Sequence, residues 1–117
     1  MELKTMKKLK FRHNLVKLIL HREKITTWRL FDDKDLKIGD TLEFIDSETN
    51  QKFAEAEILE VKEKELGKVE SSDFEGHEKY ESRANMISHY RQYYGNKVTQ
   101  KTIVKIIKFR LPENTRI

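Results

Sequence analysis

The stretch HREKITTWRLFDDKDLKIGD, His21 to Asp40, contains a short run that is typical of a β-strand. Residues 25–31 are mostly β-branched or aromatic, and such residues favour a strand. The polar segment that follows reads as a loop, which ends with turn-forming chemistry at Gly39. The sequence therefore predicts a strand that is entered from a basic segment and left through a long loop.

Three polar side chains accompany this strand: Lys24, Thr27 and Arg29. Because Thr27 and Arg29 are two residues apart, they face the same side of the strand. Lys24 precedes Thr27 by three residues, which is the wrong parity for that face, so we expect it in the turn before the strand. Trp28 points the opposite way and is expected to pack in the core. On spacing alone, the three polar residues are either solvated surface groups or the lining of one site.

A strand and a short helix are predicted before this stretch. Basic residues alternate with Leu9 and Phe11 over residues 7–12, which indicates a half-buried strand. Asn14 then has the chemistry of an N-cap, and apolar residues recur at helical spacing until about His21.

A hairpin is predicted after residues 21–40, with one strand over residues 41–45 and a longer one over residues 53–65. The apolar alternation slips near Ile58, which a β-bulge or bend would explain. Residues 66–76 read as a loop or a brief helical turn, and the length of this segment makes it a candidate functional loop.

The clearest helix is predicted over residues 77–94, and Gly95 ends it. The evidence is one stripe of residues at spacings of four and three: Tyr80, Ala84, Ile87, Tyr90 and Tyr94. The last strand is predicted over residues 102–111, is dense in Ile and Val, and should be central and well buried.

The elements thus follow the order β, α, β, β, β, α, β. Five or six twisted strands with a bulge and two main helices suit an α+β fold built as a small, partly closed β-barrel. At 117 residues, the chain is expected to form one domain, residues 1–117, around a single core.

Composition excludes several classes of function. The sequence has no cysteine, which rules out disulfides, thiolate nucleophiles and cysteine-ligated metals and favours a cytoplasmic setting. No apolar run approaches the roughly 18 residues of a membrane span. The 24 basic residues exceed the 20 acidic ones, a modest excess that is compatible with an RNA or nucleotide ligand. We expect a monomer.

Metal and phosphate motifs are also absent from the sequence. The four glycines stand alone, so there is no glycine-rich phosphate-binding loop. The four histidines show no HExxH spacing and have no cysteine partners, so we expect ordinary surface or capping residues. The sequence predicts neither a metal site nor a cofactor.

The segment REKITTWR resembles the signature of the ASCH superfamily, a group of PUA-like barrels in which Gly-x-Lys-x-x-Glu-x-Arg follows the first helix. The lysine, the acidic position and the arginine of this pattern fall on Lys24, Thr27 and Arg29. Arg22 replaces the glycine, and Thr27 replaces the glutamate. The resemblance covers most of the chain and implies a PUA-like barrel.

One branch of ASCH proteins carries Lys-x-x-Thr-x-Arg and acts as an amidohydrolase on N4-acetylcytidine, and this chain is similar to that branch. The branch also uses a glutamate from a later segment that begins with histidine and continues toward an Asn-Met pair. In HEKYESRANM the matching residue is Glu81. The resemblance implies catalytic roles for Lys24, Thr27 and Glu81.

These side chains fit the hydrolysis of an amide, which needs a nucleophile, a proton acceptor that later donates, and stabilisation of the oxyanion. Thr27 would attack the carbonyl or orient a water, with Lys24 as base if burial and Arg29 lower the pKa of the lysine. Glu81 would pass a proton to the leaving amine or hydrogen-bond the base edge. Arg29 would bind a carbonyl or phosphate oxygen of the substrate.

Three functions stay open. The first is an enzyme that removes the acyl group of a modified cytidine, and the second is a non-catalytic RNA-binding module that recognises RNA or a modified nucleoside in the same barrel mouth. The third, an interaction protein without a small ligand, requires a pocket filled by side chains. A closed pocket in which Lys24, Thr27 and Glu81 converge distinguishes the first from the second. Tyr93 lies off the helical stripe, so it is the tyrosine best suited to contact a base.

Overall fold

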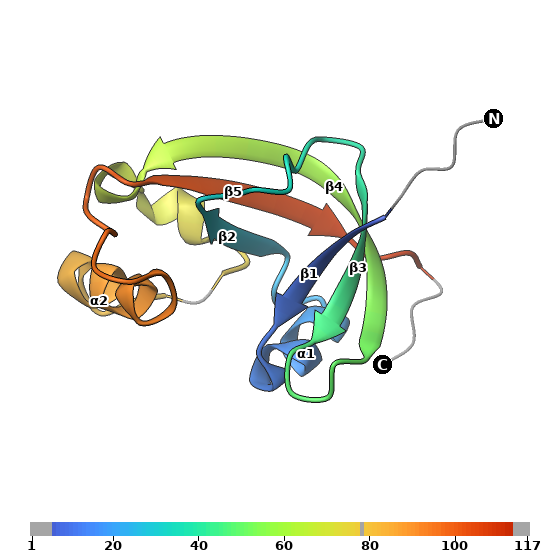
Figure 1. Ribbon diagram of the computed structural model, residues 1–117. Coiled ribbons are helices and arrows are strands. Elements are labelled where there is room, and N and C mark those ends of the chain that lie inside the picture. The colour runs from blue at the N-terminus through green and yellow to red at the C-terminus, as the bar shows by residue number, and fades with distance from the viewer. Residues whose placement is uncertain (1–5, 78, 114–117) are drawn as a thin grey trace.

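The computed structural model of the chain describes residues 6–77 and 79–113. Its elements follow the predicted order (Figure 1): β1 (Lys7–Phe11), α1 (His13–Leu20), β2 (Thr26–Leu30), β3 (Thr41–Asp46), β4 (Lys52–Glu65), the short 3-10 helices η1 (Leu66–Lys68) and η2 (Ser71–Phe74), α2 (Arg83–Tyr94) and β5 (Ile103–Arg110). No helix in these residues is long and apolar enough to cross a membrane.

The strands of the described residues form one five-stranded sheet, in the order β1-β3-β4-β5-β2. β1 is parallel to β3, and the other neighbours are antiparallel. The sheet curls, and α1 and α2 lie toward opposite ends of it (Figure 1). The predicted α+β fold, a small and partly closed barrel with two main helices, is confirmed. The last strand, β5, lies inside the sheet between β4 and β2, while β1 and β2 are the two edges.

The longest strand, β4, contains the predicted bulge. Its pairing with β5 shifts register between Ile58 and Glu60, where the apolar alternation slips. The part of β4 up to Glu57 pairs with β3, and the part from Glu57 onward pairs with β5. Because a bulge bends a strand and increases its twist, one strand can belong to both halves of the curled sheet.

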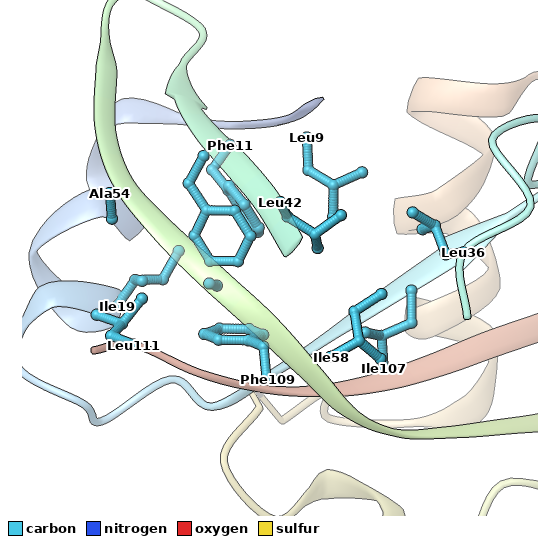
Figure 2. Packing of buried hydrophobic residues seen from close by; sticks show 12 residues of the cluster. Leu9, Phe11, Ile19, Leu36, Leu42, Ala54, Ile58, Ile107, Phe109 and Leu111 are labelled. Carbon is cyan, nitrogen blue, oxygen red and sulfur yellow. The ribbon is translucent and has the colours of Figure 1, made fainter. Parts of the chain in front are cut away.

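A first group of buried apolar side chains fills the inside of the curl (Figure 2). Its members point toward one another from α1 and four strands, and continue into neighbouring segments: Leu9, Phe11, Ile19, Leu36, Leu42, Phe44, Ala54, Ala56, Ile58, Ile107, Phe109 and Leu111. Phe44 lies at the centre of the aromatic contacts, with ring centroids 4.7 Å from Phe11 and 4.9 Å from Phe109. Full burial of each large side chain stabilises the fold by about 1.5–3 kcal/mol.

A second group of buried side chains packs α2 against the sheet: Trp28, Leu30, Leu66, Val69, Met86, Tyr90, Val98, Val104 and Ile106. Trp28 is only 4% exposed, which confirms its predicted place in the core. Side chains alternate along a strand, so Thr27 and Arg29 face the other side of β2. β5 contributes side chains to both groups.

Two helix boundaries differ from the prediction. The N-cap of α1 is Arg12, without a side-chain hydrogen bond, rather than Asn14. α2 begins at Arg83 and not at residue 77, because the Ser82 side chain accepts a hydrogen bond from the Asn85 N–H at 3.1 Å and caps the helix there. Tyr80 continues the apolar spacing of α2 in the sequence, but it lies before the helix and packs against the second group from there. Gly95 ends α2, as predicted.

Candidate functional site

A cavity of about 170 Å³ opens beside the edge strand β2, and we call it the β2 cavity. β1, β2, α2 and the segments that precede β2 and α2 supply its walls. Its polar and aromatic lining includes Lys24, Thr27, Arg29, His77, Tyr80, His89 and Tyr93. Because β2 lies at an edge of the sheet, side chains from both of its faces border this space, and Trp28 lines it together with Thr27.

The turn between α1 and β2 fixes the position of Lys24. The backbone N–H groups of Glu23 and Lys24 both donate to the carbonyl oxygen of Leu18, at 2.9 and 3.1 Å. Lys24 is 4% exposed and borders the same cavity as Thr27. The odd spacing between Lys24 and Thr27 therefore does not separate them, because Lys24 precedes β2 and its direction is set by the turn and not by the alternation of the strand.

Arg22 has a backbone conformation that is uncommon for a residue with a side chain. Arg22 has φ 62°, in the left-handed region that glycine adopts without strain. A residue with a Cβ pays roughly 1–2 kcal/mol there. The Arg22 guanidinium donates to the carbonyl oxygens of Leu20 and Pro112, both at 3.1 Å. These two hydrogen bonds offset part of the strain.

Thr27 and Arg29 form a hydrogen-bonded pair at the wall of the β2 cavity. Arg29 Nε donates to Thr27 Oγ1 at 3.2 Å, and Arg29 Nη2 donates to the carbonyl oxygen of Lys10 at 3.0 Å. The guanidinium also lies over the Phe11 ring, 4.9 Å from its centroid. Burial lowers the pKa of Arg29 from its usual value. Much of the guanidinium is thus engaged by the protein itself.

Aromatic and imidazole rings make up much of the rest of the wall. His89 lies 5.2 Å, centroid to centroid, from both Tyr80 and Tyr93, and His77 stacks on Trp28 at 4.5 Å. Tyr93, the tyrosine chosen from the sequence, borders the cavity and is 51% exposed. Rings exposed at a cavity are suited to stacking on a nucleobase.

Sequence reasoning missed His77, His89 and Tyr80 as lining residues. The two histidines were expected on the surface, and Tyr80 was assigned to the core stripe of a helix. The signal available in the sequence was the His89–Tyr93 spacing of four, which places both rings on one face of α2. Nothing local indicates that this face meets the edge of β2.

Glu81 is not brought together with Lys24 and Thr27. It is exposed, it is not part of the lining of the β2 cavity, and its Oε2 accepts a hydrogen bond from Asn85 Nδ2 at 3.3 Å. The cause is the later start of α2, which leaves Glu81 in a bend before the N-cap rather than on the helix. Of the three residues expected to meet in one pocket, Lys24 and Thr27 line the β2 cavity and Glu81 does not.

One buried donor in this region has no hydrogen bond. Trp28 Nε1 lacks a partner among the described residues, although it is shielded from solvent. Leaving such a group unsatisfied costs about 1–3 kcal/mol. The described residues contain no group of three or more His, Cys, Asp or Glu side chains placed to hold a metal ion.

No family model and no curated protein matches the sequence, but solved structures match the fold. A protein of Enterococcus faecalis V583 assigned to the family model DUF984 has a TM-score of 0.74 at 17% identity, over 94% of this chain and 82% of that one. An ASCH domain from Lactobacillus crispatus has a TM-score of 0.66 at 14% identity, over 84% and 70%. The ASCH protein of Zymomonas mobilis has a TM-score of 0.64 at 12% identity, over 88% and 65%. The chain therefore has the fold of ASCH domains, a PUA-like barrel.

Proposed function

We propose that the chain binds a modified cytidine, as a nucleoside or within RNA, in the β2 cavity and hydrolyses the N4-acetyl amide of acetylcytidine. The observation that carries this proposal is that Lys24 and Thr27, the residues that resemble the amidohydrolase branch, line one cavity walled by rings. A buried amine and a hydroxyl supply the acid–base and nucleophilic groups that amide hydrolysis needs, and ring faces suit a base.

Thr27 is the proposed nucleophile, with Lys24 as its base. Thr27 Oγ1 accepts a hydrogen bond from Arg29, which leaves the hydroxyl proton to be donated elsewhere. Lys24 is buried and borders the same cavity as Thr27, so it is the amine placed to act as the base. In the first step Oγ1 attacks the acetyl carbonyl carbon while the Lys24 amine takes the hydroxyl proton. The positive charge of Arg29 beside Oγ1 favours the developing alkoxide.

The second half of the reaction uses the same groups. The bond between the acetyl carbon and N4 breaks, and the Lys24 ammonium gives its proton to N4. Cytidine departs, and the acetyl group stays on Thr27 as an ester. A water then gives a proton to Lys24 while its oxygen attacks the ester carbonyl carbon. The bond between that carbon and Oγ1 breaks, Lys24 returns the proton to Oγ1, and acetic acid leaves and loses its own proton to the solvent as acetate. No proton passes through Glu81 in this route, because its side chain is exposed and lies outside the β2 cavity.

Incubation of the purified protein with N4-acetylcytidine, with released cytidine separated by chromatography, tests the proposal. Thr27→Val removes the hydroxyl at nearly constant shape and Lys24→Met removes the amine, so each should lower the rate by about 100-fold or more. Thr27→Ser is the matched control and keeps activity. Glu81→Gln should stay within about twofold of the unmodified protein, since general acid–base roles are worth far more than that.

Two results would contradict this mechanism. Absence of cytidine release by the folded protein rules out hydrolysis of this substrate. A large loss in Glu81→Gln with folding intact would assign the proton transfer to Glu81 and overturn the route through Lys24.

The ring-lined wall also favours the second candidate, a module that binds the base without reaction. Stacking contributes about 1–3 kcal/mol per base, and Tyr93 and His89 offer ring surface at the cavity. Binding of N4-acetylcytidine that Tyr93→Ala weakens, together with no turnover, identifies the binding module.

A further inference from the structure

A second and larger cavity, of about 970 Å³, lies on the other side of α2, and we call it the α2 groove. It is bordered by η1, by α2 and by the loop before β5. Its lining holds four basic side chains and one acidic one: Lys68, Arg83, Arg91, Lys101 and Glu65. Such a concentration of positive charge is what a phosphate backbone requires.

The two arginines of the α2 groove are held in place by the backbone. Arg91 Nε donates to the carbonyl oxygen of Val98 at 2.8 Å, and Arg83 donates to the carbonyl oxygens of Gly67 and Val69. These bonds fix each guanidinium at a wall of the groove. The carbonyl groups are neutral, and among the residues that the structure describes neither arginine has an acidic partner, whereas Lys68 pairs with Glu65 at 3.3 Å. Among the described residues, the groove is therefore preorganised for an anion.

The α2 groove is linked to the β2 cavity around the N-terminal end of α2. A third cavity, of about 540 Å³, shares Tyr80 with the β2 cavity and Arg83 with the α2 groove. Its walls include the Phe74 ring and the Lys79 side chain. The three cavities are thus neighbours, and the third carries two rings, two cations and one carboxylate: Phe74, Tyr80, Lys79, Arg83 and Glu70. Rings beside cations are the usual composition of surfaces that bind single-stranded nucleic acid.

We propose that the α2 groove binds the phosphodiester backbone of single-stranded RNA whose target nucleoside occupies the β2 cavity. This inference rests on the proposed function, and it names the substrate class as a nucleotide within a chain rather than a free nucleoside. The bases next to the target would lie along Tyr80 and Phe74, and the phosphates beyond them would meet Arg83, Lys68 and Lys101.

A binding experiment on the full chain tests the proposal. The probe is a labelled oligoribonucleotide of about ten residues, within the 4–16 nucleotides that single-stranded sites cover, with one N4-acetylcytidine at its centre. Its affinity is measured by fluorescence anisotropy at several salt concentrations. The variant Lys68→Glu with Lys101→Glu reverses two exposed charges of the groove. The variant Lys17→Glu with Lys34→Glu changes net charge equally at exposed positions outside it.

The groove variant should weaken RNA binding at least tenfold and reduce the slope of log affinity against log salt by about 1.4, since each lost phosphate contact in a single strand removes about 0.7. Its action on the free nucleoside should stay unchanged. The matched variant should alter RNA affinity by less than about threefold, because distant exposed charges are screened.

Three outcomes overturn the inference: equal losses in both double variants, an oligonucleotide that binds no tighter than the nucleoside, or equal binding of polyglutamate. Turnover of the nucleoside with any of these leaves the proposed function intact. Failure of the proposed function looks different, because the nucleoside is then neither bound nor hydrolysed while groove-dependent RNA binding persists.

Discussion

Arg29 in β2 donates a hydrogen bond from Nη2 to the carbonyl oxygen of Lys10 in β1, at 3.0 Å. These two strands are the edges of the sheet, so a side chain joins the edges where no backbone ladder connects them. The same guanidinium holds Thr27 Oγ1. Arg29 was expected from the sequence to bind substrate, and its contacts give it a second task in closing the barrel.

Replacing Arg29 by methionine should lower the free energy of unfolding by about 3 kcal/mol, because two hydrogen bonds from a charged donor are lost at about 1.5 kcal/mol each. Urea unfolding measures the change. Arg110→Met is the matched control, since Arg110 makes an exposed pair with Glu57 at 3.4 Å, and such pairs contribute about 1 kcal/mol or less. Equal effects of the two substitutions would show that Arg29 does not stabilise the junction of the edges.

The pair formed by His13 and Asp46 should make stability depend on pH. His13 Nδ1 lies 2.6 Å from Asp46 Oδ2, which raises the pKa of His13 above its ordinary 6.5, while the hydrogen bond from His13 lowers the pKa of Asp46. The contribution of His13 to the free energy of unfolding is fully present below pH 6.5 and is lost as pH rises through the raised pKa of the folded state. The melting temperature should therefore fall more between pH 6 and pH 8 in the unmodified protein than in His13→Gln. Parallel curves for the two proteins would rule this pair out as the cause.

Asp73 should act as a clamp between η2 and β4. Its buried carboxylate accepts hydrogen bonds from Lys62 at 3.2 Å, and from Lys64 and the Glu70 N–H at 2.8 Å. Burial raises the pKa of Asp73, but these three bonds outweigh it and hold the pKa below the ordinary value.

Asp73→Asn should therefore cost about 2 kcal/mol at pH 7, since the lysines are partly solvated and their charge-assisted bonds are weakened. The difference from the unmodified protein should shrink as pH falls below about 4, where the unfolded chain takes up the proton first, and further as pH passes through the lower pKa of Asp73 in the folded state. Chemical unfolding at pH 7 and pH 3 measures both values, with Asp33→Asn in the exposed loop as control. A difference that stays constant with pH would contradict the clamp.

Gly76 should be intolerant of any side chain. Its φ is 70°, and a Cβ would lie 2.1 Å from Ile25 Cγ1, while its carbonyl oxygen accepts hydrogen bonds from the N–H groups of Ile25 and Thr26. Gly39, with φ 90° and nothing within 4 Å of such a Cβ, is the matched control. Gly39→Ala should cost about 1–2 kcal/mol for backbone strain alone. Gly76→Ala should cost clearly more by thermal unfolding and weaken ligand binding in the β2 cavity, because His77 follows directly.

The sequence predicts the elements of this fold well because the signals that define them are local. Alternation along β1, the slip at Ile58 and the glycine at position 95 each act within a few residues, and the structure bears out all three. The predicted start of α2 at residue 77 is wrong. The spacing of four residues between Tyr80 and Ala84 is the same whether or not the chain between them is helical, so it could not reveal where the helix begins.

The candidate site is predicted only in part because its walls depend on the curl of the sheet. Lys24 and Thr27 are close in the sequence, so one turn is enough to bring them to one cavity. His77 and His89 reach the same cavity through the packing of α2 beside an edge strand, a relationship that no local pattern carries. Glu81 was selected by resemblance alone, and the capping of α2 at Ser82 turns it elsewhere.

The sharing of β5 by both groups of buried side chains bears on how this domain responds to its ligand. Neither group can lose its packing without freeing a strand that supports the other, so the domain should melt as one cooperative unit. Occupancy of the β2 cavity then stabilises the first group of buried side chains as well, by RT ln(1 + [L]/Kd), although Phe44 and Phe109 lie outside the lining of that cavity.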